Sequence, residues 1–174
     1  MEQKFGPRRS RETTKPRCAC PPLFFYACNV CGNMYQNLSG RKSASLACCN
    51  EVMQELPVLQ AEDVRHAIHI DYKITGGYNE NAVEVYWQIC DPSMQVRWVY
   101  LRTFTGGMLK YAVHPEKHSF IFALADEDAY VYCDEDPCLE CTFRCKRGFE
   151  IYIALNGNML VCLPLEKMTA HWQS

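Results

Sequence analysis

The residues best suited to chemistry in this 174-residue chain form two short motifs, H-x-E and P-C-x-x-C. The first supplies His114 and Glu116, and the second supplies Cys138 and Cys141. One histidine and two cysteines are zinc ligands that leave the fourth tetrahedral position open for water, as in catalytic sites. Glu116 lies two residues from the histidine, so it could take a proton from that water without binding the metal. The motifs therefore predict a hydrolytic zinc site with Glu116 as its catalytic residue.

The same cysteines also fit a closed structural zinc site. Cys133 and Cys145 lie on either side of the P-C-x-x-C motif and give the spacing C-x4-C-x2-C-x3-C. Four thiolates would complete a tetrahedral site and leave no position for water. His114 would then be an ordinary turn residue, and the sequence leaves both interpretations open.

A second group of cysteines lies nearer the N-terminus. Cys28 and Cys31, followed by a glycine, have the spacing of a zinc knuckle. Four further cysteines could complete a second, structural metal site with them: Cys18, Cys20, Cys48 and Cys49. A set of buried free thiols is the alternative.

The chain contains twelve cysteines and no recognisable secretory signal, which favours an intracellular protein with reduced thiols. Residues 1–20 contain six Lys and Arg residues and no apolar segment of the kind found in signal peptides. No apolar run approaches the length of a membrane span, so we expect no membrane partner. The net charge of -2 gives no support to a nucleic-acid partner. We expect a cytoplasmic or nuclear protein.

Helical and extended patterns alternate along the segments that must position these residues. Residues 43–56 and 60–69 have apolar residues at helical spacing. Proline at the first helical position predicts helices over 115–125 and 137–147, so each zinc motif opens a helix. β-branched and aromatic residues predict five strands: 82–90 and 95–104, which form a hairpin, then 129–133, 149–155 and 159–165. A tight turn joins the last two strands, which must therefore be antiparallel.

In combination, the two motifs and the order of elements resemble the zinc-dependent cytidine deaminase superfamily, with its nucleoside and AID/APOBEC-like members. The segments AYVYCDEDPCLEC and RGFEIYIALNGNMLVCLPLEKM are similar to the second zinc motif and the C-terminal strands of that family. The resemblance implies an α/β fold, a three-layer cytidine deaminase-like arrangement with helices on both faces of a mixed β-sheet. The chain is then divided into a disordered basic arm (1–17), a Cys-rich extension (18–42) and a deaminase-like domain (43–174).

The function that this resemblance implies is zinc-dependent hydrolytic deamination of cytosine to uracil, as in nucleic acid editing. The partner would be a cytosine-containing nucleoside or a single-stranded nucleic acid, and a homo-oligomer is left open. By resemblance, His114, Cys138 and Cys141 bind Zn²⁺ and Glu116 shuttles protons. Residues 100–113 lack the Asn-x-Glu pair that holds the ribose in nucleoside deaminases. The alternatives are a catalytically inactive deaminase fold and a zinc-structured regulatory protein that binds nucleic acid or protein.

Overall fold

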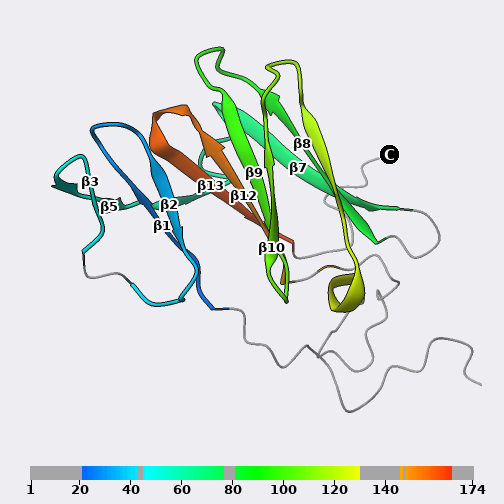
Figure 1. Ribbon diagram of the computed structural model, residues 1–174. Coiled ribbons are helices and arrows are strands. Elements are labelled where there is room, and N and C mark those ends of the chain that lie inside the picture. Colours follow the sequence, from blue (N-terminus) through cyan, green and yellow to red (C-terminus); the bar gives the residue numbers. More distant parts are fainter. Residues whose placement is uncertain (1–20, 43–44, 77–80, 130–145, 147, 166–174) are drawn as a thin grey trace, which may run out of the picture.

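The structure of the protein is a computed structural model, which describes residues 21–42, 45–76, 81–129, 146 and 148–165. These residues form β-strands, turns and two short 3-10 segments, and no α-helix occurs among them (Figure 1). Among the described residues there is also no helix with the length and apolar character that a membrane crossing requires.

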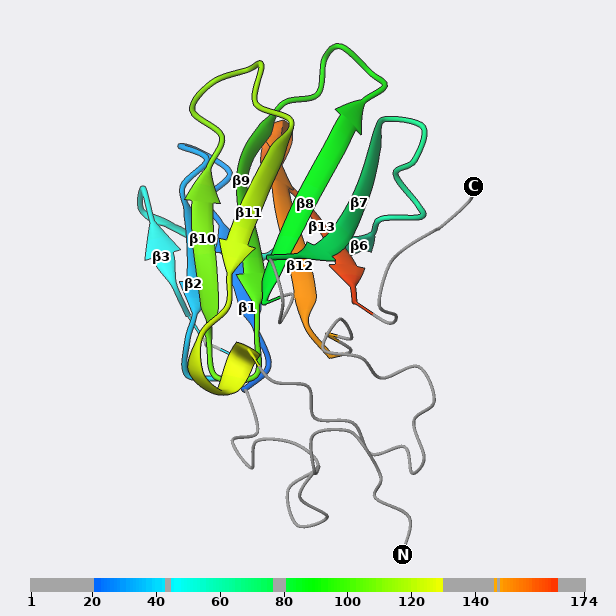
Figure 2. The same cartoon turned by 90° about the vertical axis from the view of Figure 1, so that its right-hand side faces the viewer.

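Two facing sheets make up the larger part of the described structure. One has five strands in the order β10-β9-β12-β13-β6, and the other has three in the order β11-β8-β7. Figure 2 views the three-stranded sheet with the five-stranded sheet behind it. The pairing of β13 with β6 is parallel, and all the other neighbours are antiparallel. The strands are β6 (Val58–Gln60), β7 (Ile68–Thr75), β8 (Ala82–Ile89), β9 (Val96–Arg102), β10 (Gly107–Tyr111), β11 (Ser119–Ala123), β12 (Glu150–Leu155) and β13 (Met159–Pro164).

The burial of each strand follows from the number of its faces that are covered. Along β7, buried residues such as Ile68 and Ile70 alternate with more exposed ones, because one face of this strand packs on the core. Five consecutive residues of β12, Ile151–Leu155, are all buried. A continuous buried run requires cover on both faces of the sheet. The three-stranded sheet covers one face of β12, and the N-terminal strands cover the other.

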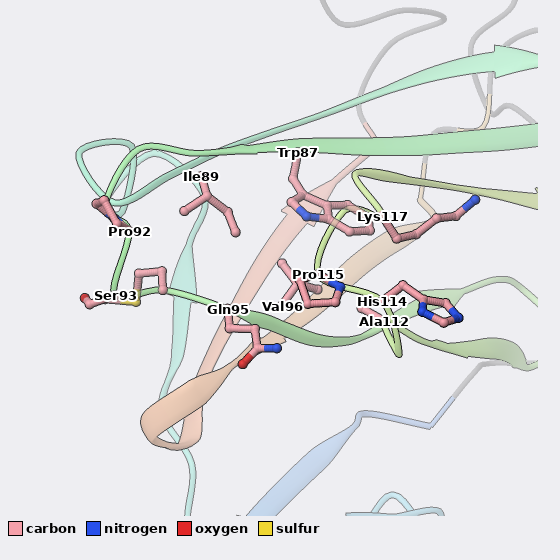
Figure 3. Close-up of a pocket in the computed structure, with 11 residues that line it drawn as sticks. Trp87, Ile89, Pro92, Ser93, Gln95, Val96, Ala112, His114, Pro115 and Lys117 are labelled. Carbon is pink, nitrogen blue, oxygen red and sulfur yellow. The ribbon is translucent and has the colours of Figure 1, made fainter.

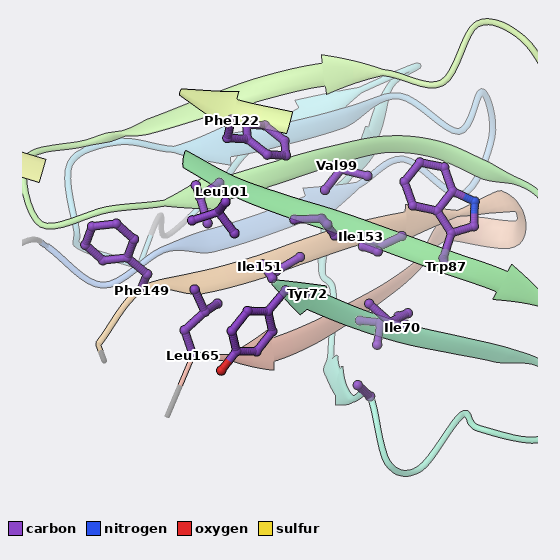
Figure 4. Close-up of a cluster of buried hydrophobic side chains, with 14 of the residues drawn as sticks. Ile70, Tyr72, Trp87, Val99, Leu101, Phe122, Phe149, Ile151, Ile153 and Leu165 are labelled. Atoms are coloured by element: carbon purple, nitrogen blue, oxygen red, sulfur yellow. The ribbon is translucent and has the colours of Figure 1, made fainter. Parts of the chain in front are cut away.

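The main core lies between the two sheets (Figure 4). Tyr72 and Trp87 enter it from the three-stranded sheet, and Val99, Leu101 and Ile153 enter it from the five-stranded sheet. Leu101 and Ile153 are fully buried, and burial of each such aliphatic side chain contributes about 1.5–3 kcal/mol. The sandwich is therefore held together by apolar packing between sheets rather than by any helix among the described residues.

The described residues between 21 and 56 form a smaller N-terminal module on the outer face of the five-stranded sheet (Figure 1). Phe25 attaches the module, because its ring centroid lies 5.3 Å from that of Tyr152 and 6.1 Å from that of Trp98. The module contains a sheet in the order β2-β1-β5 and a separate hairpin, β3-β4. Its strands are β1 (Phe24–Ala27), β2 (Met34–Asn37), β3 (Ala47–Cys48), β4 (Glu51–Val52) and β5 (Gln54–Glu55).

This all-β architecture contradicts the expected α/β fold of a mixed sheet with helices on both faces. Residues 45–56, which were expected to be helical, form the short strands β3 to β5. Residues 115–125, expected as the helix opened by H-x-E, form a turn followed by β11. In place of the expected helix at 60–69, the chain makes turns and enters β7. In these segments the spacing of apolar residues fits a helix, but it does not require one. Turns between short strands can bring the same apolar residues to one face of a β structure.

The positions of several strands were predicted correctly, but the pairing of two of them was not. Residues 82–90 and 95–104 contain β8 and β9, but these two strands lie in opposite sheets and do not form a hairpin. β12 and β13 pair antiparallel through the turn at 156–158, as expected. The strand expected at 129–133 and the helix expected at 137–147 fall largely on residues outside those that the structure describes.

Candidate metal centre

Four cysteines of the N-terminal module converge from two turns. Cys28 and Cys31 lie in the turn between β1 and β2, and Cys48 and Cys49 lie where β3 turns into β4. Their four sulfur atoms all lie within 4.8 Å of one another. Within the described part of the chain, no other group of three or more His, Cys, Asp or Glu side chains is placed to share a metal ion.

The sulfur positions fit a tetrahedral metal site. Cys48 Sγ lies 3.6 Å from Cys31 Sγ and 3.9 Å from Cys49 Sγ. A metal–sulfur bond of about 2.3 Å places the ligands of a regular tetrahedron about 3.8 Å apart. Both distances are much longer than a disulfide bond, and all four cysteines are free. The four residues can therefore bind one metal ion and would leave no ligand position open.

The first turn is shaped by its own backbone hydrogen bonds. The N–H of Gly32 donates to the carbonyl of Cys28, and the N–H of Cys28 donates to the carbonyl of Asn33, both at 2.9 Å. Gly32 has a φ of 71°, a left-handed conformation that glycine adopts without steric cost. This conformation lets the chain reverse between Cys28 and β2, so that both thiols of the C-x-x-C-G sequence face the same point.

The second turn is a two-residue hairpin loop formed by Cys49 and Asn50. Cys48 pairs with Glu51 directly before and after this loop, and the two loop residues have positive φ angles of 52° and 63°. Hairpin loops of this type require two left-handed residues, which Asn tolerates well. A left-handed Cys costs about 1–2 kcal/mol. Strained backbone of this kind occurs at functional sites, where surrounding interactions hold it in place.

The electrostatic environment differs among three of the thiols, those of Cys28, Cys48 and Cys49. The pKa of Cys28 is lowered to about 7, chiefly by its hydrogen bond with the backbone of Cys31. The pKa of Cys48 is raised, and that of Cys49 is raised to about 12, in both cases chiefly by the side chain of Cys31. In the metal-free cluster, Cys28 thus becomes a thiolate, the form that binds metals, at a lower pH than Cys48 or Cys49. A bound cation would favour thiolates at all four positions.

The candidate centre lies at the surface of the module with one ligand directed inward. Cys28 is 2% exposed and packs near Tyr26 and Met53, whereas Cys31 and Cys49 are exposed. The side-chain amide of Asn33 points its nitrogen at Cys48 Sγ from 4.0 Å. Two ligands can therefore be approached from solution, while a third is fixed in the small core of the module.

The residues predicted for a hydrolytic zinc site are not assembled in the described structure. His114 and Glu116 lie in the turn between β10 and β11, with side chains 75% and 79% exposed, and their closest atoms, Nδ1 and Oε1, are 3.8 Å apart. Cys138 and Cys141 lie outside the described residues, as do Cys133 and Cys145 of the alternative closed site, so their metal binding stays a prediction. Within the described residues, His114 belongs to no metal-ligating group.

The N-terminal metal site was predicted only in outline. Of its six candidate cysteines, the structure brings together Cys28, Cys31, Cys48 and Cys49, whereas Cys18 and Cys20 lie outside the described residues. The sequence signal that could have separated the four is the combination of a C-x-x-C-G turn with a C-C-N loop. Asn in that loop favours a hairpin, whereas the segment was expected to be helical.

Comparison with known proteins identifies no relatives by sequence but does identify a similar structure. No protein-family model and no curated protein matches the chain. The crystal structure of the superoxide reductase from Treponema pallidum is similar with a TM-score of 0.54 and 18% sequence identity. The alignment covers 82% of this chain and 98% of that protein. At this level of identity, the comparison shows a shared fold.

This similarity corrects the resemblance to cytidine deaminases. The all-β fold is similar to that of the superoxide reductase and differs from the α/β fold of cytidine deaminases. The inferred deaminase family, hydrolase activity and cytosine deamination are therefore wrong. The alternative of a catalytically inactive deaminase fold is wrong for the same reason, whereas binding of nucleic acid or protein by a zinc-structured protein stays a prediction. Of the expected zinc cofactor, the structure supports binding of a metal ion by a four-cysteine cluster.

Proposed function

We propose that this chain is a metalloprotein that holds one iron ion through Cys28, Cys31, Cys48 and Cys49 and exchanges single electrons. The proposal rests on the convergence of the four sulfur atoms within 4.8 Å. Four thiolates complete a tetrahedral shell, which suits electron transfer or structural support rather than substrate binding at the metal. Iron bound in this way supplies a one-electron couple.

Two properties of the chain's own residues support a redox role. The exposed thiols of Cys31 and Cys49 allow close approach by an electron donor or acceptor. Hydrogen bonds to sulfur and solvent exposure are the features by which proteins adjust the potential of iron–thiolate centres. The backbone interaction of Cys28 with Cys31 and the amide of Asn33 near Cys48 are such features. The similar fold of a protein described as a superoxide reductase supports an oxidoreductase and makes superoxide the first oxidant to assay.

The test is to express the full chain with iron and zinc supplied separately, and to measure metal content, visible absorption and reduction potential. We expect one iron per chain and a visible thiolate-to-iron absorption that disappears and returns with one electron. Cys49→Ser should lose this absorption, while Cys90→Ser should retain it, because Cys90 is an exposed free thiol outside the cluster. One zinc per chain with iron in excess, and no redox response, would contradict the proposal.

A structural zinc ion is the second candidate, and the small size of the module favours it. The internal core of the module contains three buried residues, Tyr26, Cys28 and Met53. Small modules with so little apolar burial commonly need a metal or disulfide to remain folded. A zinc ion would connect the two cysteine turns and hold β3-β4 against β1. Zinc in place of iron, with unfolding of the module on chelation, is the outcome that would support this candidate.

A further inference from the structure

A cavity of about 250 Å³ opens at one end of the sandwich, between the segment 92–96 and the turn 112–117 (Figure 3). It is separate from the four-cysteine cluster and does not depend on any metal there. Apolar side chains form much of its lining, among them Trp87, Ile89 and Val96. Trp87 is 4% exposed, so its indole ring is largely buried beside the cavity.

One wall of the cavity is fixed by Asn156 in the turn between β12 and β13. The side-chain amide of Asn156 donates to the carbonyl of Ser93 at 2.8 Å, and its side-chain oxygen accepts from the N–H of Gln95 at 2.9 Å. The N–H of Asn156 also donates to the carbonyl of Gln95 at 3.0 Å. Ser93 and Gln95 both line the cavity. Because one side chain joins two loops, this wall has a defined shape without a ligand.

The opposite wall is also held by backbone hydrogen bonds. The N–H of Lys117 donates to the carbonyl of His114, and the N–H of Trp87 donates to the carbonyl of His118, both at 3.0 Å. The turn that carries His114 and Lys117 is therefore attached to β8 behind it. Binding in a cavity with preformed walls does not require the loops to be ordered, which removes part of the usual entropic cost.

Lys117 is the one permanently charged side chain that lines the cavity, and beside the lining the carboxylate of Asp91 accepts a hydrogen bond from the N–H of Ser93. The lining includes Lys117 and His114 but no Asp or Glu. The aliphatic stem of Lys117, which lines the cavity, starts beside Trp87, and its ammonium group points away from the indole (Figure 3), 5.7 Å from the ring centroid of Phe120. Glu116, the nearest carboxylate on this turn, is 79% exposed and contacts His114 rather than lining the cavity. The rim therefore favours an anionic group, while the interior favours an apolar one.

We propose that this cavity binds a small molecule with a planar aromatic body and one anionic group. The aromatic body lies against Trp87 and Val96, and the anionic group lies at the rim, within reach of Lys117 and His114. Apolar burial supplies most of the binding, and the charge of Lys117 supplies the preference for an anion. His114, which was considered as a zinc ligand, is thereby assigned to ligand recognition.

The test is calorimetric titration of the full metal-loaded chain with 2-naphthoate and with its neutral counterpart, 2-naphthamide. We expect saturable binding of one molecule of 2-naphthoate per chain and weaker binding of the amide. Lys117→Gln should weaken binding of the carboxylate by about threefold to fivefold, as for an exposed ion pair, and leave the amide unchanged. Lys73→Gln, which changes an exposed lysine on β7, is the matched control and should change neither.

A second variant tests the cavity itself. Ala112→Leu places a larger side chain in the lining and should weaken both probes, because the space for the aromatic body is reduced. Circular dichroism and thermal unfolding establish that each variant is folded. Absence of saturable binding by either probe would overturn the proposal. Equal binding of carboxylate and amide, or equal effects of the two lysine variants, would overturn its anionic specificity.

Discussion

At the scale of single residues, the candidate centre depends on backbone conformations as much as on sulfur atoms. Gly32, Cys49 and Asn50 all have positive φ angles, and they lie within or directly beside the two cysteine turns. Each turn brings one pair of thiols to the same point. A cysteine pair on a straight strand would instead place neighbouring side chains on opposite faces. The chemistry of the site therefore requires residues that are not themselves ligands.

The substitution Gly32→Ala tests this dependence on backbone conformation. An added Cβ would lie 3.8 Å from Asn158 Oδ1, so there is space for it, and the cost arises from the left-handed conformation. We expect the free energy of unfolding to fall by about 1–2 kcal/mol and the metal to be lost faster to a chelator. Urea denaturation and metal-release kinetics measure the two effects.

Gly106→Ala is the matched control for that substitution. A Cβ at Gly106 meets no atom within 4 Å, and this glycine has no positive φ. We expect its unfolding free energy and its metal release to match the wild type. If the two variants behaved alike, the conformation of Gly32 would not be what shapes the turn.

Cysteines outside the candidate centre are expected to differ sharply in reactivity. Burial raises the pKa of Cys162 to about 12, so its thiol stays protonated and unreactive up to strongly alkaline pH. Cys90 is exposed. In the folded, metal-loaded protein at pH 8, iodoacetamide should modify Cys90 and leave Cys162 unmodified, as measured by peptide mass spectrometry. Rapid modification of Cys162 without unfolding would show that β13 is not packed as described.

At the scale of elements, the same apolar residues supported two different structures. Leu46 and Met53 have the spacing of a helix face, but in the structure they meet across the β3-β4 hairpin. The N–H of Met53 donates to the carbonyl of Leu46 at 2.7 Å, and Leu46 packs against the small core of the module, to which Met53 belongs. Periodicity could not distinguish these arrangements because the residues become neighbours in both. The Cys49–Asn50 loop could have indicated the hairpin.

Strands were predicted more reliably than the partners that they pair with. β8, β9, β12 and β13 follow from β-branched and aromatic runs in the sequence. The pairing of β9 with β12 joins segments about fifty residues apart and depends on the whole sandwich. Local sequence carries no direct signal for such a contact, so the short connection between β8 and β9 was mistaken for a hairpin turn.

Phe25 is the most deeply buried residue by which the N-terminal module packs on the five-stranded sheet. Its side chain is 3% exposed and lies against Tyr152 and Trp98 of the five-stranded sheet. Phe25→Ala should lower the free energy of unfolding by about 3–5 kcal/mol, as for other large-to-small substitutions in cores. Tyr35→Ala is the matched control, because Tyr35 is an aromatic residue of the same module that is 48% exposed. Urea denaturation should give a much larger loss for Phe25→Ala, and similar losses would contradict this packing.

At the scale of the whole molecule, the sequence indicated the metal site but did not indicate the fold. The cysteines near the N-terminus indicated a metal site, because ligand type and spacing are local properties. The β-sandwich was missed because the H-x-E and P-C-x-x-C motifs directed the interpretation toward a helical framework. His114 and Glu116 show the weakness of such short motifs, since they lie in an exposed turn and not at a helix start.

The four-cysteine cluster and the proposed ligand cavity both lie on turns at the ends of strands. A Cβ added at Gly32 would lie in ordinary contact distance of Asn158, so the first cysteine turn lies close to the turn between β12 and β13. Asn156 of that same turn holds one wall of the cavity. The sandwich thus positions the metal module and the cavity wall through one connecting turn, which fits the general use of loops for function on a rigid framework.

The central claim is that four cysteine thiolates of the N-terminal module bind one metal ion. X-ray absorption spectroscopy at the metal edge of the purified full chain tests it most directly, with metal content measured on the same sample. We expect one iron per chain surrounded by four sulfur atoms at about 2.3 Å, and loss of that signal in Cys48→Ser. A first coordination shell of nitrogen and oxygen atoms, or a metal signal unchanged by Cys48→Ser, would contradict the account.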